Sequence, residues 1–231
     1  MCGIVGYTGF QDAYDIVING LRRLEYRGYD SAGIVLEDKN NSFEVKKTKG
    51  KVSDLVEISE NLKATSHVGM GHTRWATHGV PSDRNSHPHV SNDGKIALVH
   101  NGIIENYDTI KTMLIGKGFT FSSETDTEVL VNLIQYILDT QKINFSEAVR
   151  YALNEVYGAY AITVMHKDYP GVLVVGRLGS PLAIGLGDKE YFIASDASPF
   201  VEFTKEAVYL EDGHMATISL EKGVEKSSIK E

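Results

Sequence analysis

Cysteine is almost absent from this chain, since Cys2 is the only one in 231 residues. A single cysteine excludes a disulfide within the chain and is typical of a reducing compartment, so we expect a cytoplasmic protein. Basic residues are also few, with 23 lysines and arginines against 31 aspartates and glutamates and a net charge of -8. That balance disfavours binding to the phosphates of nucleic acids, and no stripe of basic residues offsets it.

Long apolar runs are missing as well. None approaches the ~20 residues that a helix needs to cross a bilayer, and we expect no signal peptide before Cys2. The remaining composition is ordinary for a globular protein, 42% hydrophobic and 23% charged. A chain of this length can bury one sizeable core, so we expect one domain over residues 2–220. Residues 221–231 are charged and are expected to form a tail or the start of a linker.

The apolar pattern predicts strands at both ends of the chain and helices between them. Short apolar or alternating runs predict strands over residues 2–7, 32–36, 43–47, 67–72, 96–100, 159–165, 172–175, 182–185, 191–194 and 208–218. Helical spacing predicts helices over residues 12–24, 52–62, 105–114, 126–138 and 145–156. Ser123, with Asp126 three residues on, predicts where the fourth helix begins. This order favours an α+β fold, a four-layer α/β/β/α sandwich.

Cys2 stands directly behind the initiator methionine, in Met-Cys-Gly-Ile-Val-Gly. A small residue there permits removal of Met1, which leaves Cys2 with both a thiol and a free α-amine. The pKa of an α-amine is about 8, so much of it is unprotonated at neutral pH. One residue then holds a nucleophile and its own general base. Alternatively, Cys2 is only a small apolar residue at the start of a strand.

Several segments around this cysteine resemble the class II glutamine amidotransferases, enzymes with an N-terminal nucleophile that take ammonia from glutamine. They are the Cys2 start and residues 71–79, 100–102 and 122–128. Residues 25–33, 72–79 and 85–89 are similar to the glutaminase half of one branch, the glucosamine-6-phosphate synthases. The resemblance covers essentially the whole chain and implies the fold of N-terminal-nucleophile hydrolases.

The resemblance also implies an activity, the hydrolysis of glutamine to glutamate and ammonia through a thioester on Cys2. L-glutamine is then the substrate, and neither a metal nor an organic cofactor is required. In that branch a second, larger region binds fructose 6-phosphate and uses the ammonia to make glucosamine 6-phosphate. No segment of this sequence resembles that region.

By the same resemblance, Arg74 binds the α-carboxylate of glutamine and Asp126 binds its α-ammonium group. A guanidinium can hold a carboxylate by two parallel hydrogen bonds, and a carboxylate is stabilised near a helix N-terminus. The Asn101 side-chain amide and the Gly102 backbone N–H match the oxyanion hole. Viewed alone, Asp126 is as readily a helix cap, and Asn101-Gly102 is a common hairpin turn. A surface arginine is a weaker alternative for Arg74, because Arg74 follows a strand and precedes Trp75.

Trp75, Thr77 and His78 match the wall of the glutamine pocket. Arg27 matches a residue near the nucleophile, where a cation favours the thiolate. A structural ion pair between Arg27 and Asp30 is the alternative.

Residues 78–92 match a segment that closes over the pocket and are rich in histidine. His78, His87 and His89 are candidate metal ligands by residue type. The only acidic residue nearby is Asp83 and no cysteine joins them, so the pattern does not favour a metal site.

Three other functions remain open from the sequence. The chain is alternatively the glutaminase domain of a different class II amidotransferase, or an N-terminal-nucleophile amidase that acts on another amide. If Met1 is retained, the α-amine belongs to Met1 and the nucleophile is blocked. The chain is then a glutamine sensor without catalysis.

Overall fold

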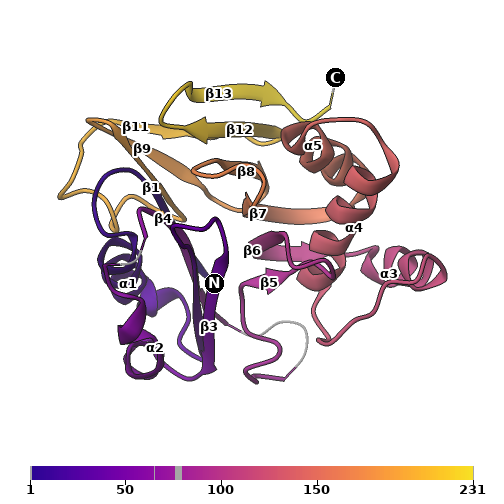
Figure 1. The fold of residues 1–231 in the computed structure, drawn as a ribbon, viewed down its shortest axis with the longest axis horizontal. Coiled ribbons are helices and arrows are strands. Elements are labelled where there is room, and N and C mark those ends of the chain that lie inside the picture. Colours follow the sequence, from indigo (N-terminus) through magenta and orange to yellow (C-terminus); the bar gives the residue numbers. More distant parts are fainter. Residues whose placement is uncertain (1, 65, 76–79, 231) are drawn as a thin grey trace.

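The computed structural model describes residues 2–64, 66–75 and 80–230. Within these residues the strands form two antiparallel sheets that pack face to face (Figure 1). The first sheet holds, in spatial order, β11 (Ala207–Tyr209), β9 (Ala183–Gly187), β10 (Glu190–Ala194), β1 (Gly3–Thr8), β4 (Val68–Arg74), β2 (Ser31–Glu37) and β3 (Phe43–Lys49). The second holds β13 (Gly223–Ser228), β12 (His214–Ser219), β8 (Leu173–Leu178), β7 (Gly158–His166), β6 (Ile96–Ile104) and β5 (His89–Val90).

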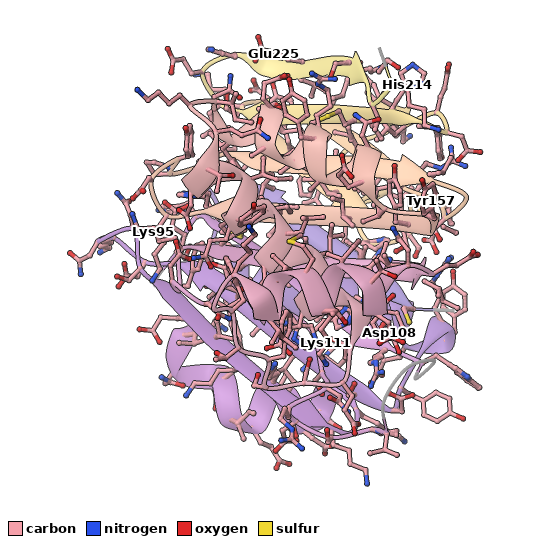
Figure 2. All side chains as sticks on the ribbon, turned by 90° about the vertical axis from the view of Figure 1, so that its right-hand side faces the viewer. Lys95, Asp108, Lys111, Tyr157, His214 and Glu225 are labelled. Atoms are coloured by element: carbon pink, nitrogen blue, oxygen red, sulfur yellow. The ribbon has the colours of Figure 1, made fainter. Side chains whose placement is uncertain are left out.

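Helices cover the outer face of each sheet. The first sheet carries α1 (Ala13–Leu24) and α2 (Val52–Ser59), which continue into the short 3₁₀ helices η1 (Glu25–Arg27) and η2 (Glu60–Leu62). The second sheet carries α3 (Tyr107–Gly116), α4 (Asp126–Thr140) and α5 (Phe145–Glu155). Figure 2 looks onto this second side, where Lys95 and Asp108 lie at the surface. Of the described helices, none is long and apolar enough to cross a membrane.

The two sheets and the two groups of helices form four layers, and three apolar clusters lie between them. One lies between α1, α2 and the first sheet, one between the two sheets, and one between the second sheet and α3–α5. The predicted α/β/β/α sandwich is therefore confirmed. Strand β1 shows how the sequence builds it, since all six of its residues are buried and alternate between two layers. Ile4 packs between the sheets, whereas Val5 and Tyr7 pack under the helices.

The start of α4 differs from the prediction. Thr125, not Ser123, is the residue before the first turn, and its hydroxyl accepts from the Glu128 backbone N–H at 3.3 Å. The Glu128 carboxylate in turn accepts the backbone N–H groups of Ser122 and Ser123. A hydroxyl residue is followed three positions later by a carboxylate twice in this segment, at Ser123 and Asp126 and at Thr125 and Glu128. The helix uses the second pair as its cap.

The C-terminal prediction also needs correction. The run 208–218 is two strands, β11 and β12, which belong to different sheets and are separated by a turn at Gly213, where φ is +75°. Residues 221–230 are not an unpacked tail, because β13 pairs with β12 and Ile229 is buried in the core. The charged residues of β13 lie on the edge strand of the second sheet, where side chains reach solvent. The start of a linker to a further region stays a prediction.

Candidate active site

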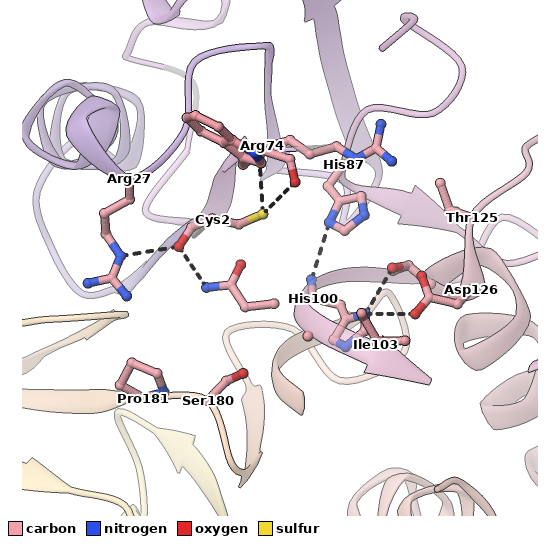
Figure 3. A pocket seen from close by; sticks show the side chains of 14 residues that line it. Cys2, Arg27, Arg74, His87, His100, Ile103, Thr125, Asp126, Ser180 and Pro181 are labelled. Atoms are coloured by element: carbon pink, nitrogen blue, oxygen red, sulfur yellow. Dashed lines mark hydrogen bonds and ion pairs between the residues drawn. The ribbon is translucent and has the colours of Figure 1, made fainter. Parts of the chain in front are cut away.

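A cavity of about 220 Å³ opens where the N-terminal end of β1 meets β4, β6 and the start of α4 (Figure 3). The predicted site residues that the structure describes all line it: Cys2, Arg27, Arg74, Trp75, Asn101, Gly102 and Asp126. They come from five separate segments, so only the tertiary fold brings them together. The other two, Thr77 and His78, lie outside the described residues.

Cys2 immediately precedes β1, on the same side of the chain as Ile4, and therefore faces the layer between the sheets. Its Sγ accepts a hydrogen bond from the Trp75 backbone N–H at 3.2 Å and lies 3.5 Å from the Trp75 carbonyl oxygen. Burial raises the pKa of the Cys2 thiol, and this outweighs the lowering by the Trp75 N–H and the nearby Arg74 charge. The thiol is therefore neutral at pH 7 and needs a base before it can attack.

Arg27 binds the backbone of the nucleophile residue. Its Nε donates to the Cys2 carbonyl oxygen at 3.2 Å, and its Nη1 pairs with Asp196 at 3.0 Å. Burial opposes ionisation of Asp196, but hydrogen bonds from Ser198 and Tyr26 and the Arg27 charge hold its pKa below the usual range. Sequence reasoning did not single out this acidic partner. The result is an ordered guanidinium that fixes where Cys2 lies.

Asn101 and Gly102 lie inside β6, where they pair with Ala161 and Tyr160 of β7. The hairpin alternative is therefore wrong. Gly102 has a φ of +128°, and a β-carbon there would lie 2.0 Å from the Ala159 carbonyl oxygen. No other residue fits this backbone without displacement.

The Asn101 side chain makes three hydrogen bonds. Its Oδ1 is 2.9 Å from His72 Nε2, and its Nδ2 donates to Ser195 Oγ at 2.9 Å and to the Cys2 carbonyl oxygen at 3.1 Å. Burial lowers the pKa of His72 to about 3, so the ring is neutral. Because an amide oxygen only accepts, the ring proton is on Nε2. The amide group is thus oriented at both ends and lies against Cys2.

Arg74 ends β4 and Asp126 begins α4, and both residues are nearly buried, at 4% and 5% exposure. The Asp126 Oδ2 accepts from the Ile104 backbone N–H at 2.8 Å and lies 3.9 Å from His100 Nδ1. Since Thr125 caps the helix, Asp126 is not its cap. The cavity therefore presents a buried cation and a buried carboxylate, the pair that suits the two ends of an amino acid zwitterion.

Four buried histidines lie at the site, His72, His87, His89 and His100, and two of them, His87 and His100, line the cavity. The rings of His72 and His87 are 4.2 Å apart, and those of His87 and His89 are 5.0 Å apart. Burial lowers the pKa of His87 and of His89 well below the usual value. In residues 2–64, 66–75 and 80–230, no group of three or more histidine, cysteine or acidic side chains is placed to hold a metal ion. His89 instead hydrogen-bonds the Thr125 hydroxyl at 2.9 Å.

Sequence reasoning missed three residues that orient the site: His72, Ser195 and Asp196. His72 stands in the segment that carries the resemblance, and its place on strand β4 two residues before Arg74 was a usable signal. Ser195 and Asp196 follow an unremarkable strand near the other end of the chain. Nothing in their local sequence marks them.

Comparison with known proteins assigns the chain to a family. Residues 59–227 match the family model of the glutamine amidotransferase domain. The chain belongs to that family.

This amidotransferase domain is 54% identical over 219 residues to the glutamine–fructose-6-phosphate aminotransferase (isomerizing) of Bacteroides thetaiotaomicron, covering 95% of this chain and 36% of that protein. It is 53% identical over 223 residues to the protein of the same name from Chlorobaculum tepidum, again covering 95% and 36%. The chain thus spans about 36% of the length of these relatives.

Among solved structures, the glutamine phosphoribosylpyrophosphate amidotransferase from B. subtilis, complexed with ADP and GMP, superposes on this domain with a TM-score of 0.84. It is 28% identical, and the match covers 99% of this chain and 49% of that one. The predicted fold of N-terminal-nucleophile amidotransferases is therefore confirmed, as is the resemblance to the glutaminase part of the fructose-6-phosphate aminotransferases. The roles of single residues stay predictions.

Proposed function

We propose that the chain hydrolyses L-glutamine to glutamate and ammonia through a thioester on Cys2. We also propose that it does so as the ammonia-supplying domain of an enzyme that makes glucosamine 6-phosphate from fructose 6-phosphate, a step of amino sugar biosynthesis. One observation carries the first proposal: the only thiol of the chain lies in the same cavity as the Asn101 amide, Arg74 and Asp126. The names of the relatives support the second.

The reaction follows from the positions of these groups. The α-amine of Cys2, directly or through a water, takes the thiol proton, and Sγ attacks the side-chain amide carbon of glutamine. The negative charge that develops on oxygen is stabilised by the Asn101 amide and the Gly102 N–H. The carbon–nitrogen bond then breaks, and ammonia leaves with a proton from the same amine. Water hydrolyses the γ-glutamyl thioester to glutamate and restores the thiol.

The raised pKa of the Cys2 thiol is consistent with this mechanism. A thiol that ionised by itself at neutral pH would not need the α-amine, whereas a neutral thiol does. The mechanism therefore requires that Met1 be removed. Trp75, Thr77 and His78 complete the wall of the pocket in this proposal, and Arg27 holds the Cys2 carbonyl.

The direct test replaces Cys2 by alanine in protein whose processed N-terminus has been established by intact mass. We expect the release of glutamate and ammonia to fall to the level of a mock purification, with an unchanged melting temperature. A glutamine-like electrophile should add once to the parent protein and not to the variant, because there is no second cysteine. Residual glutaminase activity in Cys2→Ala would show that another nucleophile acts. Full activity with Met1 retained would show that the α-amine is not the base.

A further inference from the structure

We propose that Ser195 is a positioning residue for catalysis, which aims one N–H of the Asn101 amide at the reaction centre by accepting the other. This inference rests on the proposed function, because it concerns the donor that would stabilise the oxyanion there.

The Ser195 hydroxyl is fixed by buried contacts. Ser195 follows β10 directly and is only 2% exposed. Its Oγ accepts from the Ile4 backbone N–H at 2.8 Å and from Asn101 Nδ2 at 2.9 Å. Its own backbone N–H donates to the Ile4 carbonyl oxygen at 3.1 Å. Ser195 is therefore held on both sides to a residue two positions from Cys2.

Asn101 needs a hydrogen bond that holds it to Cys2, because Cys2 adjoins one sheet and Asn101 belongs to the other. Cys2 precedes a strand of the first sheet, whereas Asn101 lies on β6 of the second. Every hydrogen bond described above for the Asn101 side chain reaches across the interface, to His72 on β4, to Ser195 after β10 and to Cys2. The distance between nucleophile and donor thus depends on these contacts as well as on sheet packing.

The two protons of the amide nitrogen have different partners. One is donated to Ser195 Oγ, and the other is donated to the backbone carbonyl oxygen of Cys2, the residue that carries the thiol. The terminal torsion of asparagine is broad, so a single contact at the oxygen leaves the N–H groups poorly directed. With His72 on the amide oxygen and Ser195 on one proton, the remaining N–H is held toward Cys2, where it donates to the backbone carbonyl until an oxyanion forms nearby. Donors oriented in advance of the reaction stabilise a developing oxyanion most effectively.

The consequence is a separation of effects on kcat and KM. The hydroxyl of Ser195 bonds Ile4 and Asn101, neither of which is proposed to bind the ends of glutamine, so its loss should leave binding of glutamine nearly unchanged. Removal of an oxyanion donor typically lowers kcat by about 100- to 1,000-fold. A donor that is present but poorly aimed should lower it less, by about tenfold or more.

The test begins with Ser195→Ala in protein processed to Cys2. We expect kcat for glutamine to fall about tenfold or more while KM stays within about threefold of the parent. Alkylation of Cys2 by iodoacetamide, which forms no oxyanion, should keep its rate within about twofold. Ser59→Ala is the matched control, since Ser59 is also a fully buried serine, on α2, whose Oγ donates to the Leu55 carbonyl. It should leave all three values unchanged.

A double-mutant cycle decides whether Ser195 acts through Asn101. In an Asn101→Ala background, Ser195→Ala should change kcat by less than about twofold, because the group that it aims is gone. An equal fold-loss in both backgrounds, a rise in KM alone, or a parallel loss of alkylation rate overturns the proposal. If Asn101→Ala itself keeps the parent kcat, the oxyanion assignment of the proposed function fails. If Asn101→Ala is slow and the two losses multiply, only the role of Ser195 fails.

Discussion

At the scale of single residues, the site depends on groups that are charged or strained and yet buried. Arg74 and Asp126 are almost inaccessible to water, and Gly102 has a backbone conformation that L side chains rarely adopt. Such features cost stability unless a ligand or a packing requirement uses them. Each therefore makes a prediction about a single substitution.

Replacement of the two charged residues should weaken selection of glutamine. Arg74→Lys loses the planar two-bond geometry, and Asp126→Asn loses the charge that faces the ammonium group. Each should lower kcat/KM for glutamine by about 2–4 kcal/mol in transition-state stabilisation, measured by steady-state kinetics. Arg150→Lys on α5 is the control, because Arg150 pairs with Glu147 far from the cavity. Values within twofold of the parent for both site variants would return Arg74 and Asp126 to a structural role.

Replacement of Gly102 by alanine should damage both fold and activity. Its φ of +128° and the 2.0 Å approach of a β-carbon to the Ala159 carbonyl oxygen force the chain to shift. We expect a loss of about 1–3 kcal/mol in the free energy of unfolding, measured with urea, and a kcat near background. Gly94→Ala is the control for backbone strain without a steric clash, since Gly94 has a φ of +72° and no atom within 4 Å of an added β-carbon. Equal losses of stability in both variants would contradict the predicted collision.

At the scale of elements, periodicity found almost every helix and strand, because buried faces leave a pattern in the sequence. The prediction failed where the sequence offers two possible helix caps, or where one apolar run contributes strands to two sheets. The start of α4 offered two capping frames, and the run 208–218 looked continuous although its halves join different sheets. Strand β13 was missed because a charged edge strand has no apolar pattern. Ser195 was missed because its partners lie far away along the chain.

The buried histidines connect β4, β5 and β6 and give the fold a dependence on pH. The pKa of His72 is about 3 in the folded state, and those of His87 and His89 are also well below their usual value. Below pH 6.5 the unfolded chain therefore binds more protons than the folded one, and stability falls as pH falls from about 6.5 toward 3. Urea midpoints at pH 7.5 and pH 5.0 should show this decline.

A substitution within the cluster checks its source. His89→Gln should make the decline between pH 7.5 and pH 5.0 shallower, because one imidazole that resists protonation is gone. An unchanged slope in this variant, or a parent protein equally stable at both pH values, would show that the cluster does not govern acid stability.

At the scale of the whole molecule, the sandwich brings Cys2, the proposed nucleophile just before a strand of the first sheet, close to Asn101, the proposed oxyanion donor on the second sheet. Both residues line the same cavity as Arg74 and Asp126, the proposed clamp for glutamine. All the proposed groups for glutamine hydrolysis therefore lie between Cys2 and Asp126 in the sequence. Ser195 and Asp196, which follow β10, contact two of these residues, Asn101 and Arg27. The relatives named for fructose 6-phosphate are more than two and a half times as long as this chain, since the matched 219 to 223 residues are 36% of their length.

From this arrangement we expect glutamine hydrolysis and sugar amination to be separable. The chain processed to Cys2 should release glutamate and ammonia from glutamine at equal rates, measured by coupled assays for each product. Fructose 6-phosphate should neither raise that rate nor yield glucosamine 6-phosphate, because no glycine-rich phosphate loop opens a helix in this sequence. Cys2→Ala supplies the background for both assays. Formation of the amino sugar, or clear stimulation by fructose 6-phosphate, would mean that the described fold holds a sugar-phosphate site, and the cavity at Cys2 would then need to be reassigned.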